Sequence, residues 1–423
     1  MHFLLACGIV LALEAAFDYL TEKRESPGIT QSIFDLTGLY QKVVASPRYP
    51  IARYTVVVEI NPDKDPSVAG MKDVCDQREM ITRLLRNMAP ALPNVIVLDK
   101  YYEPHTPKPC PADTALIQTV QYLRQHSVPV VIGRRIDPES MEDIKGRYYL
   151  RPTLAFEEPD TCLEQAARRN SPCYEAVVNI DPDTRRLPLE WLLYPSREAA
   201  EKDLEQSWWD TIALRAAVTY DDNLLVHHPR LSFFIERQIH PFISFLKMQD
   251  FAHFLVSQLM PENATTEASD ETRLCNLSCT NVSPELRKLS GKIVLVGEIN
   301  EVDEHPSVVG RMPGVYLQAN FIEALLDDRY YRPIPFLDYV FGFAFLVGLE
   351  LVLIVYRNQW LKLALLIAGL FIVSLAIVYL SVKLLGWYVN PGPVGAAAIL
   401  IKLLHVAFTR AEKDLEELHT PYS

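Results

Sequence analysis

The segment YTVVVEIN, residues Tyr54–Asn61, is the stretch from which the fold of this chain is worked out. It is a short run rich in β-branched residues that ends in turn-forming chemistry, so it predicts a buried strand. Its apolar residues follow one another instead of alternating with polar ones. That pattern is typical of a parallel sheet covered on both faces.

Further strands and helices alternate outward from this segment. The expected elements are a helix from about Asp76 to Met88, a strand NVIVLDKYY from Asn94, a helix from Asp113 to His126, a strand VPVVIG from Val128, a strand GKIVLVGEIN from Gly291 and a helix from Tyr316. Such alternation predicts an α/β domain with a mainly parallel sheet covered by helices, over residues 45–335.

The middle of the chain is less regular. Residues 140–175 are polar and contain cysteines, which indicates a disulfide-stapled loop region. Residues 200–220 are expected to form a helix that includes Trp208 and Trp209. Residues 226–285 are interpreted as an insertion whose end is rich in turn-forming residues.

The C-terminal part is apolar enough to interact with lipid. Residues 336–408 contain three segments of about the length that crosses a bilayer, roughly 336–356, 361–382 and 388–408, joined by short connections. Residues 2–20 predict a further membrane segment, although a cleaved signal peptide is the alternative. The expected organisation is one N-terminal and three C-terminal membrane helices, with residues 409–423 as a short cytoplasmic tail.

Basic residues near the segment ends predict the orientation. Arg357 and Lys362 lie between the first two C-terminal segments, and Arg410 and Lys413 follow the third. If these residues are cytoplasmic, the 45–335 domain lies outside the inner (plasma) membrane.

The cysteines fit this orientation. One of the seven lies in the N-terminal segment, and the other six lie in the expected outer domain. An even number on the oxidising side favours disulfides. The expected pairs are Cys162–Cys173, Cys275–Cys279 and Cys75–Cys110. Zinc is the alternative, but no CxxC pair is present and no histidines have ligand spacing, so no metal site is predicted.

Charge and motifs limit the functions. The net charge of −12 does not favour nucleic-acid binding, which usually needs a basic face. There is no phosphate-binding glycine loop, nucleophile elbow or metalloprotease helix, so neither a cofactor nor an enzymatic activity is predicted.

Several blocks, in their order along the chain, resemble the CHASE2 family of extracytoplasmic sensor domains. They are VVVEIN with Arg78 and VIVLDKYYEP after it, DTALIQTV, VVNIDPDTRRLPL, SWWDTIALRAA and GKIVLVGEINEVDEHPSVVGRMPGVYLQANFIEALL. The sequence departs from the family pattern at Thr184, where glycine is usual, and at Gln318, where histidine is usual. The tryptophan-proline run before Arg78 is also missing.

The resemblance implies a receptor module. Members of the family commonly act on a cytoplasmic kinase, cyclase or similar output domain. Only TRAEKDLEELHTPYS follows Phe408 in this sequence. The expected partners are therefore the lipid bilayer and a separate signalling protein, with homodimerisation as a further expectation.

Five residues are candidates for ligand binding. Asp99 and Asp303 each follow a strand, where open parallel sheets place their ligands. Together with Arg78 and Asp113 they are expected to meet in one crevice, and His305 beside Asp303 is an acid-base candidate. The structural alternative is that Asp113 caps a helix and the others fix loops by hydrogen bonds.

Two other sets of charged residues are singled out. Arg185 and Arg186 either hold an anion or pair with Asp181 and Asp183. Glu350 and Lys402 lie at similar depth in the first and third C-terminal segments. They predict an intramembrane ion pair, with separate snorkelling to the interface as the alternative.

The sequence thus favours a sensory or regulatory membrane protein. The rival classes are an extracytoplasmic enzyme and a structural or assembly component of the membrane.

Overall fold

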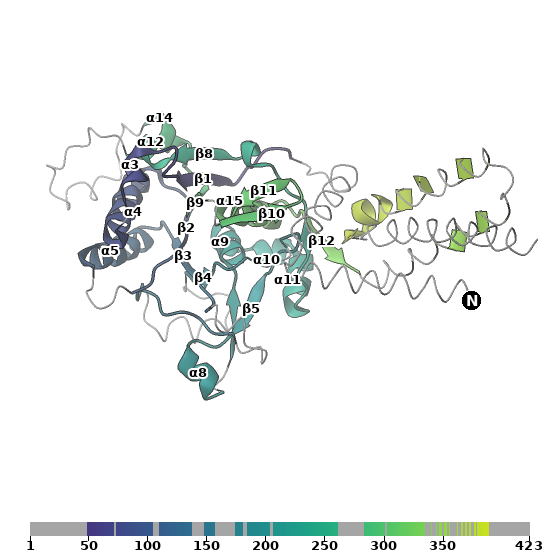
Figure 1. The fold of residues 1–423 in the computed structure, drawn as a ribbon, viewed down its shortest axis with the longest axis horizontal. Helices are drawn as coiled ribbons and strands as arrows, with labels where there is room; N and C mark the ends of the chain where they lie inside the picture. The colour runs from purple at the N-terminus through teal and green to yellow at the C-terminus, as the bar shows by residue number, and fades with distance from the viewer. Residues whose placement is uncertain are drawn as a thin grey trace, which may run out of the picture. The chain divides into compact units, whose positions relative to one another are not determined.

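The computed structural model describes residues 49–334, except 72, 105–109, 138–147, 157–173, 181–183, 204–205, 261–282 and 301–302, and parts of 340–388. Residues 47–330 belong to one compact unit (Figure 1). The expected disulfides Cys162–Cys173 and Cys275–Cys279 and the pair Glu350–Lys402 lie outside the described residues.

A parallel sheet forms the centre of the 47–330 unit. Its six strands lie in the order β4-β3-β2-β9-β1-β8, and every pairing between them is parallel. Their bounds are β1 Thr55–Ile60, β2 Val95–Tyr101, β3 Val130–Arg134, β4 Glu175–Val177, β8 Ala252–Leu255 and β9 Ile293–Glu298. The α/β fold expected from the sequence is confirmed, with β9 and β2 in the middle of the sheet.

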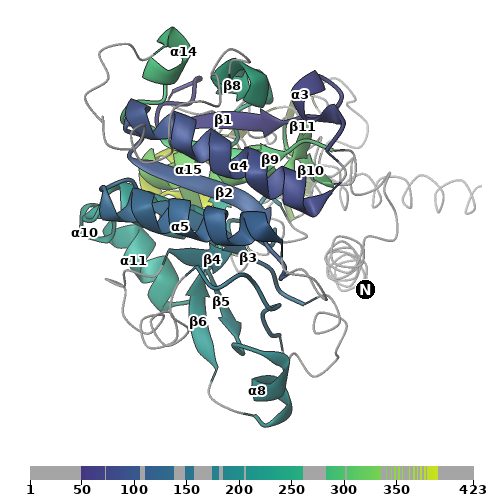
Figure 2. The ribbon, with the colours of Figure 1, turned by 90° about the vertical axis from the view of Figure 1, so that its left-hand side faces the viewer.

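Helices cover both faces of the sheet. Helices α4 (Val74–Met88) and α5 (Pro111–Gln125) pack together in front of the strands in Figure 2, and α15 (Gly314–Leu326) lies behind them. Helix α9 (Ile212–Tyr220) packs against α15 and against β2 and β3. The domain therefore has three layers, α/β/α, as parallel strands buried on both faces require.

The alternation of side chains divides the core between the two faces. Ile96, Leu98, Val294 and Val296 form one buried cluster with the apolar face of α4 and α5. Their strand neighbours point to the α9 and α15 side, because successive side chains leave a strand on opposite faces. This division decides which polar residues meet beyond the strand ends.

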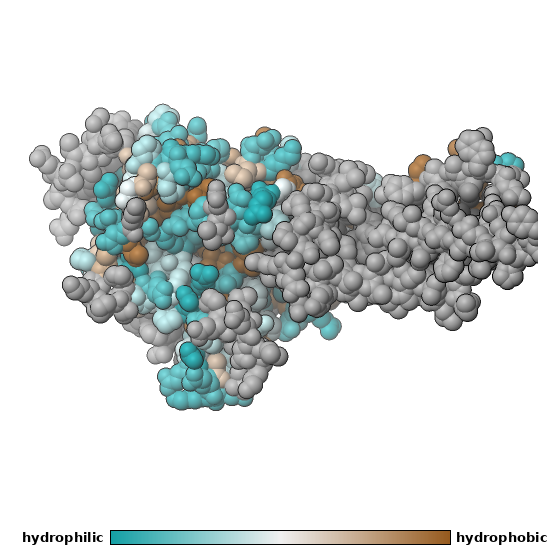
Figure 3. All heavy atoms as spheres, in the orientation of Figure 1, coloured by the Kyte–Doolittle hydropathy of each residue, from teal (hydrophilic) through white to brown (hydrophobic). Residues whose placement is uncertain are grey.

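Shorter elements complete the unit. They are α3 Pro66–Ala69, η1 Ala89–Ala91, β5 Glu190–Leu193, α8 Arg197–Glu201, β6 Ser207–Asp210, α10 Leu224–His227, α11 Pro229–Glu236, β7 Phe242–Ile243, η2 Met248–Asp250, α12 Val256–Leu259, α14 Pro284–Arg287, β10 Glu304–Ser307 and β11 Gly310–Pro313. The visible face of the described domain is mainly hydrophilic (Figure 3).

Two expectations about the middle of the chain are corrected. Trp208 and Trp209 lie in β6, which pairs antiparallel with β5, and the helix begins only at Ile212. The segment interpreted as an insertion contributes β8, which pairs with β1 at the edge of the central sheet. This part of residues 226–285 is therefore a strand of the central sheet.

The residues after the domain form a small strand pair. β12 (Tyr330–Pro333) pairs in parallel with β13 (Trp387–Tyr388), with Arg332 opposite Trp387 and Pro333 opposite Tyr388. The five-residue helix η4 (Ser381–Leu385) precedes β13. Among the residues that the structure describes, no helix is both long enough and apolar enough to cross a membrane.

Candidate functional site

Polar side chains gather where the central strands end, and the pleat sorts them between the two faces. Lys100 and Glu298 are in register with the apolar residues that face α4 and α5, whereas Glu59 and Asp99 face α15. Two groups result, one on each face of the carboxyl edge of the sheet. This edge is where open parallel sheets bind their ligands.

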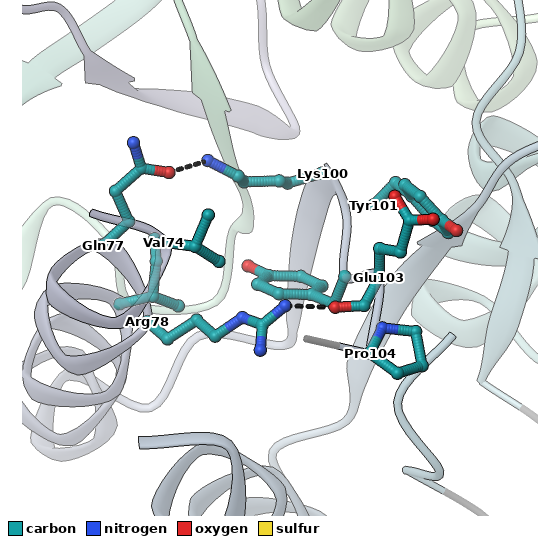
Figure 4. Close-up of a pocket in the computed structure, with 9 residues that line it drawn as sticks. Val74, Gln77, Arg78, Lys100, Tyr101, Glu103 and Pro104 are labelled. Carbon is teal, nitrogen blue, oxygen red and sulfur yellow. Dashed lines mark hydrogen bonds between the residues drawn. The ribbon is translucent and has the colours of Figure 1, made fainter. Parts of the chain in front are cut away.

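A cavity of about 400 Å³ lies on the α4 side of this edge. It is lined by the beginning of α4 and by the chain that continues β2: Val74, Gln77, Arg78, Ile81, Lys100, Tyr101, Tyr102, Glu103 and Pro104 (Figure 4). Its volume lies in the range of small-molecule sites.

Two cations line the cavity, and each has defined partners. Lys100 Nζ donates to Gln77 Oε1 at 2.8 Å and forms an ion pair with Glu298. Arg78 forms a buried ion pair with Asp113 and donates to the carbonyl oxygen of Glu103 (Figure 4). The positive charges are balanced by carboxylates, so the cavity is polar without a large net field.

Tyr102 contributes a buried hydroxyl to the wall of the cavity. The residue is 2% exposed, and its ring packs edge-on against Phe156 with centroids 5.7 Å apart. Its hydroxyl has no hydrogen-bond partner among the described residues. Burial raises the pKa of Tyr102 above its usual value, Glu298 raises it further and Arg78 lowers it. The hydroxyl is therefore a neutral donor under the influence of both side chains.

A disulfide joins the two helices beside the cavity. Cys75 in the first turn of α4 is bonded to Cys110, with Cα atoms 5.7 Å apart. Cys110 is the residue that precedes α5. The bond joins the amino ends of the two helices one turn before the Arg78–Asp113 pair, so both contacts hold the same pair of helices together.

The second group lies on the α15 side of the edge. Asp303 accepts a hydrogen bond from the Gly314 backbone N–H at 3.2 Å, and its other oxygen lies 3.3 Å from His305 Nε2. Burial raises the pKa of Asp99 to about 8, with the Asp303 charge as the second cause. Asp99 therefore holds a proton at neutral pH, next to the beginning of α15.

Helix α15 is held at several points along its length. Tyr316 donates to Glu59 beneath the sheet edge, and Gln318 Nε2 donates to the Val178 carbonyl at 3.1 Å. Near the other end, Glu323 accepts from the backbone N–H groups of Tyr54 and Thr55, both at 2.7 Å. Gln318, which stands where the family usually has histidine, thus connects α15 to the residue after β4.

The predicted site residues do not form one crevice. The structure brings Arg78 and Asp113 together beside the cavity, and Asp99, Asp303 and His305 together on the other face. Asp113 is not the cap of its helix: α5 begins at Pro111, and Asp113 lies in its first turn. It accepts from Arg78, which accounts for its burial.

Arg185 and Arg186 lie beside Phe242. Each guanidinium stacks over the ring of Phe242, at 5.9 and 5.3 Å from its centroid. The expected partners Asp181 and Asp183 lie outside the described residues. In the described part of the chain, no group of three or more His, Cys, Asp or Glu side chains is arranged to hold a metal ion.

Sequence reasoning missed Lys100, Tyr102, Gln77 and Glu298. Lys100 and Glu298 lie at the carboxyl ends of buried strands, which is the same signal that singled out Asp99. Tyr102 carried no such signal, because an aromatic residue after a strand is most often part of the core.

Fold and site thus define the class of protein. It is a three-layer α/β domain with a parallel sheet and a polar cavity at the carboxyl edge of that sheet. The model of the CHASE2 domain matches residues 4–355. The chain belongs to the CHASE2 family, whose members are extracytoplasmic sensor domains. A search of curated proteins and a search of solved structures both gave no match.

Proposed function

We propose that this chain is a membrane-anchored sensory or regulatory protein. Its extracytoplasmic CHASE2 domain binds a ligand or partner, and membrane helices relay the change to a separate output protein. The observation that carries the proposal is the family match over residues 4–355, which spans the domain and parts of the chain on both sides of it. The role is one of binding and not of turnover.

Helix α15 supports a relay from the domain to the C-terminal segments. It begins at Gly314, which is bound by Asp303 at the carboxyl edge of the sheet, and ends at Leu326, shortly before the domain unit ends at Tyr330. With 13 residues it is about 20 Å long. A shift at its beginning reaches Leu326 along one helix, and a short turn then leads to the end of the domain unit.

The pairing of β12 with β13 supports the proposed orientation. Arg332, two residues beyond the domain unit, donates from its backbone N–H to the Gly386 carbonyl at 2.9 Å. Gly386 lies between the second and third proposed membrane segments. Four crossings with a large outer domain require this connection to lie on the same side as the chain that leaves the domain, and the contact between Arg332 and Gly386 supports that arrangement.

Within the membrane segments, an ion pair between Glu350 and Lys402 remains part of the proposal. Unpaired charges at that depth are costly. Exchanging the two residues is expected to restore the expression lost in the single variants Glu350→Lys and Lys402→Glu. Additive losses in the double variant would contradict the pair.

The proposed function is tested by isolating the tagged full-length chain from its native membranes. We expect a kinase, cyclase, protease or similar output protein to copurify, and its activity in membranes to change when the chain is deleted. Two results together would contradict the proposal. They are that no such protein copurifies with the chain and that deletion of the chain changes no signalling activity in the membranes.

A further inference from the structure

The cavity beside α4 contains a hydrogen-bond donor that the described protein does not use. Tyr102 is almost completely buried, and its hydroxyl is without a partner in the described part of the chain. Buried hydroxyls are nearly always hydrogen-bonded, because an unpaired one loses its bonds to water without compensation. Because Tyr102 also lines the cavity, its hydroxyl is a position at which a bound molecule can supply the partner.

A second donor is fixed nearby. Lys100 Nζ is held by Gln77 Oε1 at 2.8 Å and by Glu298, and its side chain is still 22% exposed. An ammonium group has three donors, so one remains for a ligand. The charge of Glu298 also raises the pKa of the Tyr102 hydroxyl. The two donors therefore lie near the same carboxylate. Both groups donate, and their common complement is an oxygen acceptor.

The rest of the lining limits the ligand further. Val74, Ile81 and Pro104 provide apolar surface beside the donors. Arg78 is already engaged by Asp113 and by the Glu103 carbonyl, so it stiffens the wall. A compact molecule with an acidic end and a short hydrocarbon part fits these walls.

We propose that this cavity binds a small organic carboxylate, whose oxygens accept hydrogen bonds from the Tyr102 hydroxyl and the Lys100 ammonium group. The proposal rests on the proposed function, since it gives the sensor domain its ligand class. The carboxylate accepts from the remaining donor of Lys100, which keeps Gln77 and Glu298 as partners, and from the Tyr102 hydroxyl.

Matched acids and amides test the inference on the full-length chain in detergent. The probes are hexanoate and glutarate, with hexanamide and glutaramide as uncharged analogues of the same shape, and binding is measured by calorimetry and by the shift in melting temperature. We expect the acids to bind at least tenfold more tightly than their amides.

Two variants locate the binding. Tyr102→Phe removes only the hydroxyl, so we expect it to weaken acid binding about tenfold. Without ligand it should melt at the same or a higher temperature than the natural chain, because the unpaired group is gone. Lys100→Met should also weaken acid binding and abolish the preference for acids over amides. Tyr122→Phe on α5, outside the cavity, is the matched control and should bind like the natural chain.

Several results would overturn the inference. They are the absence of binding by either acid, equal binding of acids and amides, or unchanged binding in both Tyr102→Phe and Lys100→Met. A Tyr102→Phe chain that melts lower without ligand and binds normally would make the hydroxyl structural. None of these results affects the copurification of an output protein, so failure of this site and failure of the sensory role are distinguishable.

Discussion

Arg78 on α4 and Asp113 on α5 form an ion pair whose side chains are only 4% and 12% exposed. It lies one helical turn beyond the disulfide between Cys75 and Cys110. A covalent bond and a buried ion pair thus fix the same two helices, and Arg78 of this ion pair lines the cavity. We infer that this corner is built to be rigid.

Arg78→Met is expected to lower the free energy of unfolding by about 3–5 kcal/mol, because Asp113 is left as an unpaired buried charge. The double variant Arg78→Met/Asp113→Leu should recover a large part of this loss. Denaturation of the solubilised chain measures both. The exposed pair Arg197–Glu201 is the control, and Arg197→Met should cost no more than about 0.5 kcal/mol. Equal effects at the two pairs would show that Arg78 is not electrostatically buried.

Removing the disulfide with Cys75→Ala/Cys110→Ala is expected to cost about 3–4 kcal/mol. The bond closes a loop of 35 residues, and the chain-entropy model gives this magnitude for such a loop. A reducing agent should lower the melting temperature of the natural chain and leave that of the double variant unchanged. Identical responses of the two chains would contradict a stabilising role of this bond.

Asp99 predicts a pH dependence of stability. Its pKa in the folded protein is raised to about 8 by burial and by Asp303, far above the usual value for a carboxyl group. Between these two values the unfolded chain loses the proton while the folded chain keeps it. Stability contributed by Asp99 is therefore complete at low pH and is lost as the pH rises toward 8.

Asp99→Asn should remove this slope and stabilise the protein at pH 8 by at least about 1 kcal/mol. Melting temperatures of both chains from pH 5 to pH 9 measure the effect. Asp303→Asn removes only the second cause and should reduce the slope in part. An Asp99→Asn chain with the same pH profile as the natural one would refute the raised pKa.

Gly297 on β9 predicts a steric effect between the sheet and α15. A Cβ atom at this position would lie 2.7 Å from Val315 Cβ, which is too close for two carbon atoms. Gly297→Ala is therefore expected to destabilise the domain by about 1–3 kcal/mol. Gly70→Ala, where nothing lies within 4 Å of the added atom, should have little effect. Similar melting temperatures for the two variants would show that α15 moves aside without cost.

The long elements of the fold could be predicted from the sequence because their patterns are local. The β1, β2 and β9 segments are continuous apolar runs, and the apolar residues of α4 repeat at helical spacing. Strand β8 could not be predicted in this way. Its four residues, AHFL, have no distinctive pattern and are a strand only because β1 offers them a partner.

The candidate site was predictable only in part for a similar reason. The end of a parallel strand singled out Asp99 and Asp303 as candidates at the edge of the sheet. Which face each one occupies depends on the register of its strand, and a shift of one residue reverses the face. Lys100, one residue after Asp99, therefore belongs to the cavity on the opposite side.

Labelling a cysteine at Val226 is the most direct test of the central claim that the CHASE2 domain lies outside the cytoplasm. Val226 is 76% exposed in α10, so Val226→Cys should react readily with a membrane-impermeant maleimide. We predict labelling in intact cells or spheroplasts, with the natural chain as the blank and Ser423→Cys labelled only after permeabilisation. A Val226→Cys chain that is labelled only after the membrane is opened would place the domain in the cytosol and contradict the account.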